Sequence, residues 1–103
     1  MIVLLSPAKS LDFESAPPSE KSSEIQFAEE AEYLAGKLKK MSARKLKSLM
    51  DISEDLAQLN AERYAQWSLP FTEKNSKQAI FAFTGDVYQG LEAQTLKESD
   101  LTY

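Results

Sequence analysis

The stretch "LKSLMDISEDLAQL", residues 46–59, predicts two helices joined by a short polar connection. Ser42 is expected to cap the first helix, over residues 43–50, because a serine oxygen can accept hydrogen bonds from the free amides of a first turn. Asp51, followed three residues later by Glu54, has the character of a capping box and predicts a second helix that ends near Gln66. The side chains expected to be buried are Leu46, Leu49 and Met50 in the first helix, and Leu56, Leu59, Tyr64 and Trp67 in the second.

This pair of predicted helices, over about residues 42–66, resembles a helix-hairpin-helix. That motif binds duplex backbones by pointing the free amides of its second helix at phosphate. Here the connection is Asp51, Ile52 and Ser53, and it lacks the glycines that usually let the backbone approach a phosphate closely. An ordinary helical pair, stabilised by its own core, is the alternative.

The charges near this pair change sign along the chain. The net charge is −4, but an acidic block comes first and a basic block without any acid spans residues 37–47. A basic patch can attract a polyanion even in an acidic protein, because the relevant field acts within a Debye length. A solvated helix face is the alternative. The acids are Glu20, Glu24, Glu29, Glu30 and Glu32, and the bases are Lys37, Lys39, Lys40, Arg44, Lys45 and Lys47.

Outside this region the pattern predicts an α/β fold. Residues 2–5 are expected to form a short buried strand, and residues 14–23, "ESAPPSEKSS", a loop. An earlier helix is expected over residues 24–40, with an apolar stripe. Residues 79–83, "AIFAF", predict either the continuation of a helix or a second buried strand, and the phenylalanines favour a strand. The stripe consists of Phe27, Ala31, Leu34 and Leu38.

Two short helices are also expected near the end of the sequence. Thr72 is expected to cap one that runs to Gln78, and Ser99-Asp100 to open another. A lone first strand has no sheet to join, so the sequence is interpreted as an incomplete part of a larger α/β fold, with residues 1–103 belonging to a single domain.

Composition narrows the chemistry available to this chain. Its 103 residues are 43% hydrophobic and 27% charged, which is typical of soluble globular material, and no stretch approaches a membrane span. The sequence contains neither cysteine nor histidine, which excludes disulfides, thiolate chemistry, imidazole bases and the usual zinc and haem sites within it. Carboxylate-rich metal sites remain open on these grounds, but no cofactor and no metal site are predicted.

Three residues are weak catalytic candidates. Ser6 and Lys9 match the S-x-x-K pattern of a serine activated by a lysine, but the companion S-D-N and K-T-G elements are absent. A loop in which Lys9 binds phosphate and a plain exposed turn are the alternatives. Asp86, in a predicted turn with Tyr88, could act as a general base or a magnesium ligand, and a purely structural turn is the alternative.

Four blocks of sequence together resemble the N-terminal portion of the bacterial peroxide-stress protein YaaA family. They are "LLSPAKSLDF" at residues 4–13, "LMDIS..LA.LNA.R" at residues 49–63, Trp67, and "QAIFAFTGDVYQGL" at residues 78–91. Members of that family are much longer, so the resemblance covers essentially all of this chain but less than half of a full member.

The resemblance implies a cytoplasmic protein with an α/β fold, linked to peroxide resistance and to limiting free intracellular iron. It also implies binding of double-stranded or structured DNA through a positively charged cleft with a helix-hairpin-helix, which falls on residues 46–59. No membrane partner is expected, and the oligomeric state is left open. The predicted DNA- or phosphate-binding residues are Lys9, Lys40, Arg44, Lys45, Lys47, Asp51, Ile52 and Ser53.

Two other functions follow less directly from these residues. The first is an enzyme that acts on a phosphate-bearing or nucleic-acid substrate, with Lys9 and Asp86 near its site. The second is a direct iron sequestrant. The sequence disfavours the latter, because without histidine or cysteine only scattered carboxylates could bind iron.

Overall fold

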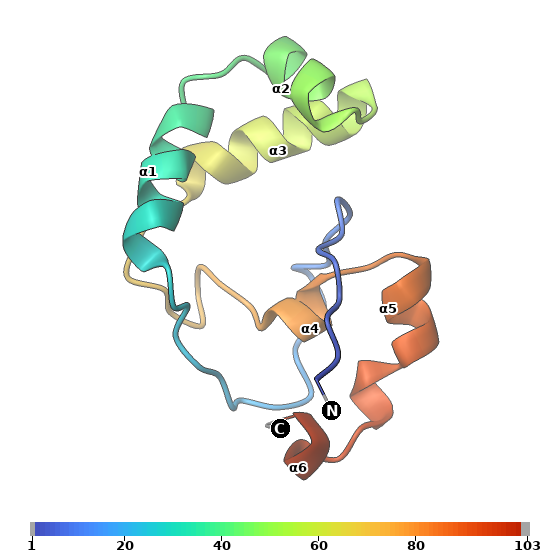
Figure 1. Ribbon diagram of the computed structural model, residues 1–103. Coiled ribbons are helices and arrows are strands. Elements are labelled where there is room, and N and C mark those ends of the chain that lie inside the picture. Colours follow the sequence, from blue (N-terminus) through green and yellow to red (C-terminus); the bar gives the residue numbers. More distant parts are fainter. Residues whose placement is uncertain (1, 102–103) are drawn as a thin grey trace. The chain divides into compact units, whose positions relative to one another are not determined.

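The computed structural model describes residues 2–101, and the chain divides into two compact units. The central unit is Glu24–Asn75, and the terminal unit combines Met1–Ser23 with Ser76–Tyr103. The central unit contains three helices, α1 (Ala28–Leu38), α2 (Ala43–Met50) and α3 (Glu54–Gln66). Helix α3 packs against both α1 and α2 (Figure 1).

The core of the central unit is made mostly of small side chains. Leu46 on α2 is fully buried, and Ala35 on α1 and Ala57 on α3 are buried beside their neighbouring helices. Asn60 is also buried, and its Nδ2 donates a hydrogen bond to the Leu56 carbonyl at 2.8 Å. Because alanine occupies little space, these helices can approach closely, and the single large side chain of Leu46 fills the space that remains.

The predicted bounds of α2 and the predicted end of α3 are confirmed, but the predicted start of α3 is corrected. Helix α2 covers residues 43–50, and the Ser42 hydroxyl accepts a hydrogen bond from the Lys45 amide at 3.3 Å. Helix α3 ends at Gln66 as expected, but its N-cap is Ser53, which accepts from the Leu56 amide at 3.3 Å. Asp51 instead ends α2 in the left-handed conformation, with φ at 53°. The prediction of a capping box at Asp51 was therefore wrong.

The predicted apolar stripe of α1 is displaced. The helix starts at Ala28 rather than near residue 24, and Phe27 and Leu34 are 68% and 57% exposed. The covered edge contains residues spaced by three and four positions, as one helix face requires, but it is made largely of alanine. Leu49 and Leu59 on the other two helices are also exposed rather than buried. The covered residues of α1 are Ala28, Ala31, Ala35, Gly36 and Leu38, so Ala31 and Leu38 of the predicted stripe are covered.

The terminal unit is built from short helical segments. These are α4 (Ala79–Ala82), α5 (Asp86–Leu91), the 3₁₀ turn η1 (Ala93–Thr95) and α6 (Glu98–Leu101) (Figure 1). Helix α4 contacts η1, and among the described residues of this unit the buried ones are Phe81, Ala82 and Ala93.

The α/β prediction was wrong for residues 2–101. Within that range the β pairing consists of one isolated antiparallel bridge between Leu11 and Phe83, flanked by hydrogen bonds from Asp12 N to Ala82 O at 2.7 Å and from Thr84 N to Ser10 O at 3.0 Å. Residues 2–5 are irregular and exposed instead of forming a buried strand.

The second predicted strand, residues 79–83, forms a single helical turn instead. The amides of Ala82 and Phe83 donate to the carbonyls of Gln78 and Ala79, so this segment satisfies its backbone locally. A strand would need a partner along its whole length, and the described residues offer a partner at one position only.

Three smaller expectations also changed. The helix expected from Thr72 is a turn, in which the Thr72 amide donates to Asn75 Oδ1 at 2.6 Å. The predicted turn around Asp86 is helix α5, preceded by Gly85 with φ at 124°. The last helix starts at Glu98, so Ser99 and Asp100 lie within it rather than at its cap. The loop over residues 14–23 is confirmed.

Candidate functional site

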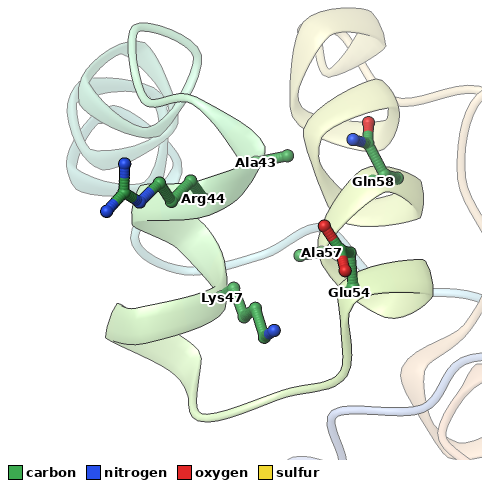
Figure 2. A pocket seen from close by; sticks show the side chains of 6 residues that line it. All are labelled: Ala43, Arg44, Lys47, Glu54, Ala57 and Gln58. Atoms are coloured by element: carbon green, nitrogen blue, oxygen red, sulfur yellow. The ribbon is translucent and has the colours of Figure 1, made fainter.

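A groove lies between α2 and α3 in the central unit. It has a volume of about 310 Å³. Its lining follows from helical spacing, because residues three or four positions apart share one face of each helix. The lining residues are Ala43, Arg44 and Lys47 from α2, and Glu54, Ala57 and Gln58 from α3 (Figure 2).

The charges of this groove come from both helices. Lys47 and Glu54 extend toward the space between the helices, whereas the Arg44 guanidinium extends away from α3 (Figure 2). Lys45, also on α2, is exposed but does not line the groove. Helix α2 contains no acid, so its three cations give this helix a positive surface, which the Glu54 carboxylate opposes from the other wall.

The start of α3 differs from the arrangement expected of a helix-hairpin-helix. The Ser53 hydroxyl already accepts the Leu56 amide, and the carboxylates of Glu54 and Asp55 stand in the first turn. These acids stabilise the helix through a favourable interaction with its dipole, but they repel a phosphate that approaches the same amides. The α2 cations are therefore better placed to attract phosphate than the α3 amides are.

The other predicted binding residues of the central unit are not among the residues that line this groove. Lys40 is exposed in the turn after α1, and the connection of Asp51, Ile52 and Ser53 stands outside the groove lining. The sequence did not predict the lining residues Ala43 and Ala57, nor the two polar ones, Glu54 and Gln58. Their spacing of four residues at the start of a predicted helix is the signal that could have placed them on one wall.

The remaining candidates lie in the terminal unit. The Tyr88 hydroxyl on α5 donates a hydrogen bond to the Ser6 carbonyl, and the rings of Phe83 and Tyr88 lie 5.3 Å apart. The segment that carries Ser6 and Lys9 is thereby brought beside α5, of which Asp86 is the first residue. All three candidate side chains, those of Ser6, Lys9 and Asp86, are exposed.

A buried lysine organises the loop that follows this segment. Lys77 has only 7% of its side chain exposed, and its Nζ donates to the carbonyls of Asp12 at 3.0 Å and Ser15 at 2.8 Å. The same Nζ lies 3.7 Å from Asp12 Oδ2. No local pattern could reveal this contact, because its partners are 62 and 65 residues away in sequence.

Asp12 is ionised over the ordinary pH range. Hydrogen bonds from the Ser15 amide and hydroxyl, then from the Glu14 amide, together with the nearby Lys77 ammonium, lower the pKa of Asp12 to about 2. The adjacent Gln78 adds a second set of contacts, because its Nε2 donates to the carbonyls of Ser19 at 2.7 Å and Lys21 at 3.0 Å. Two consecutive side chains, Lys77 and Gln78, thus shape one long loop.

Comparison with known proteins gives the family. The family model described as peroxide stress protein YaaA matches residues 1–103. This chain belongs to the YaaA family. The resemblance expected from its sequence blocks is therefore confirmed.

The curated relatives are longer than this chain. Proteins named UPF0246 protein from Paraburkholderia xenovorans, Paraburkholderia phytofirmans and Burkholderia mallei are 52%, 50% and 48% identical to it over 103 residues. Each match covers 100% of this chain but 40% of the relative. The chain thus corresponds to the N-terminal portion of a YaaA family member.

The described residues contain neither a cluster placed to bind a metal ion nor a helix that could span a membrane. Among residues 2–101, no group of three or more aspartate, glutamate, histidine or cysteine side chains is placed to bind a metal ion. No helix within the same range has both the length and the apolar character needed to span a bilayer.

Proposed function

We propose that this YaaA-family chain binds the backbone of double-stranded DNA through α2, as part of the response to peroxide stress. In that role it would help to limit free intracellular iron and damage to DNA. The observation that carries the DNA proposal is the positive surface of α2, a helix without any acid, on which Lys47 extends into the groove, Arg44 extends away from α3 and Lys45 is exposed. Family membership supports the link to peroxide stress.

The proposed mechanism is electrostatic and independent of base sequence. At physiological salt a charge acts over about 8 Å, so a phosphate near α2 is influenced by the local cations more than by the net charge of −4. The Arg44 guanidinium can bind phosphate oxygens in a bidentate manner, and the Lys47 ammonium acts as a point charge. Lys9, Lys40 and Lys45 would add further attraction to the duplex.

The test is a double substitution, Arg44→Gln with Lys47→Gln, assayed by fluorescence anisotropy on two unrelated duplexes over a range of salt concentrations. We expect weaker binding to both duplexes and a salt slope reduced by roughly two units, since each phosphate that the protein neutralises contributes about 0.9 to the slope. The matched control pairs Lys74→Gln with Lys21→Gln. Lys74 and Lys21 are exposed cations outside α2. The proposal fails if the two double variants bind alike.

A second candidate function concerns the terminal unit. The hydrogen bond between Tyr88 and Ser6 and the bridge between Leu11 and Phe83 bring together two blocks that are far apart in sequence. Lys9 and Asp86 on these blocks could then serve an enzyme that acts on a phosphate-bearing substrate. Under that proposal, Lys9→Ala and Asp86→Asn abolish release of phosphate or nucleotide from a nucleic-acid substrate, whereas the α2 variants retain it.

A further inference from the structure

Four consecutive large apolar residues stand exposed at the start of the described chain. The exposed fractions are 87% for Ile2, 69% for Val3, 90% for Leu4 and 43% for Leu5. Burial of an aliphatic side chain of this size stabilises a protein, so leaving four in water forgoes a large stabilisation. Contiguous apolar surface of this kind usually marks an interface.

The rest of the terminal unit does not cover these residues. Its described buried residues are Phe81, Ala82 and Ala93, of which only one is large. The same unit also exposes Phe13 by 50% and Val87 by 61%. The hydrogen bond from the Tyr88 hydroxyl to the Ser6 carbonyl fixes the point at which the apolar run ends, so the run is attached to the unit at a defined place.

The length of the relatives indicates what covers this run. More than half of each curated relative lies outside the region matched by this chain. A covalently linked segment is present at a high effective concentration, whereas a second copy of the chain must overcome the full entropy cost of association. Residues 2–5 carry no charge, so the surface that meets them must itself be apolar.

We infer that residues 2–5 are a docking surface for the polypeptide that full-length YaaA family members carry beyond this N-terminal portion. The inference concerns burial of these side chains and is independent of DNA binding. It explains how a unit with so few buried residues can keep four aliphatic side chains together at its surface.

The experiment compares one thiol in two proteins. The chain contains no cysteine, so Leu4→Cys gives a single reactive site, and Ser22→Cys in the exposed loop gives the matched control. Each is placed in the 103-residue chain and in a chimera, where this chain replaces the matched portion of the Paraburkholderia xenovorans relative and any other cysteine is changed to serine. Maleimide labelling of position 4 should be at least about tenfold slower in the chimera than in the short chain, because labelling then requires local opening, while position 22 labels alike in both.

Three results would overturn the inference. Position 4 could label equally fast in both proteins, so that nothing covers it. It could be protected in the short chain in a concentration-dependent manner, which would identify a second copy as the occupant. The chimera could also lack a cooperative unfolding transition, which would mean that its remaining polypeptide does not pack on this portion.

Discussion

Positive φ occurs among the described residues at Asp51, Gly85 and Glu92, each of which lies at the end of a helix. Asp51 ends α2 at φ 53° and ψ 60°, a left-handed conformation that aspartate tolerates better than most side chains. The connection between α2 and α3 can therefore turn tightly without the glycine that its sequence lacks. Gly85 precedes α5 at φ 124° and ψ 173°, a region open essentially to glycine alone. Substitution at position 85 should therefore be tolerated far less well than substitution at position 51.

The first prediction follows from Gly85. Gly85→Ala should lower the free energy of unfolding by about 1–3 kcal/mol, because alanine is strained in this conformation. Nothing lies within 4 Å of a Cβ added there, so a clash makes no contribution. Urea unfolding of the chimera, followed by circular dichroism, measures the effect, because a free energy of unfolding requires a cooperative transition. The control is Gly90→Ala, which lies within α5 and also has open space; it should stabilise by about 0.5–1 kcal/mol. Equal effects of the two variants would contradict the role of φ.

The second prediction concerns pH and Asp12. Its pKa is lowered from 3.8 to about 2, so the folded state favours the ionised carboxylate. The stabilisation is fully present above pH 3.8 and is lost as the pH falls toward about 2, where the carboxylate becomes protonated in the folded state as well. Asp12→Asn should flatten the dependence of thermal stability on pH in this window. Glu14→Gln, an exposed neighbour, serves as the control; an unchanged pH profile in Asp12→Asn would refute the prediction.

At the scale of elements, the features that could be predicted from the sequence are those with local signals. Ser42 and the bounds of α2 could be predicted, because a cap and an eight-residue pattern lie within a few positions of each other. The conformation of the two predicted strands could not be predicted in this way. Residues 79–82 form a helical turn that satisfies their backbone hydrogen bonds locally, and residues 2–5 have no partner strand among the described residues. The edge by which α1 packs was displaced for a related reason. Helical spacing gives the faces of a helix, but only the neighbouring helix decides which face is covered.

The residues of the candidate site also fall into two groups, those that local sequence predicts and those that only the packing of the helices brings together. Arg44 and Lys47 could be predicted from charge alone, since an acid-free basic block is visible in the sequence. Glu54 and Gln58 belong to the groove only because α3 packs beside α2, and the contacts of Lys77 join segments more than 60 residues apart. Pairwise packing of this kind cannot be predicted from periodicity within one segment.

The third prediction uses the opposing wall of the groove. Glu54→Gln should strengthen binding to every duplex by about two- to fivefold, because it removes a negative charge that extends toward the same space as the Lys47 ammonium. The same change should lower the stability of α3 by about 0.3–1 kcal/mol, because it removes the favourable interaction of an acid in the first turn with the helix dipole. Anisotropy measures the affinity and urea unfolding the stability. The control is Glu62→Gln on α3, which is exposed and outside the groove. An increase in affinity equal to that of the control would exclude a role for the groove.

At the scale of the whole molecule, little apolar volume is buried. The buried hydrophobic residues of the described chain are Ala35, Leu46, Ala57, Phe81, Ala82 and Ala93, and four of these six are alanine. Alanine contributes little to the free energy of burial, whereas every ordered residue costs conformational entropy. The helices of this chain are therefore expected to be only marginally stable without further packing.

The fourth prediction is calorimetric. A well-packed domain of about 100 residues unfolds with an enthalpy of about 70 kcal/mol. The isolated 103-residue chain should instead show a broad transition with a much smaller enthalpy, because unfolding exposes few large side chains that were buried. Differential scanning calorimetry measures the enthalpy, and far-ultraviolet circular dichroism follows the loss of helix. The chimera with the Paraburkholderia xenovorans relative should show a sharp transition whose calorimetric and van't Hoff enthalpies agree, since its added polypeptide supplies the missing apolar contacts. A sharp transition near about 70 kcal/mol in the isolated chain would mean that this portion is a complete cooperative domain, and that its exposed aliphatic residues need another explanation.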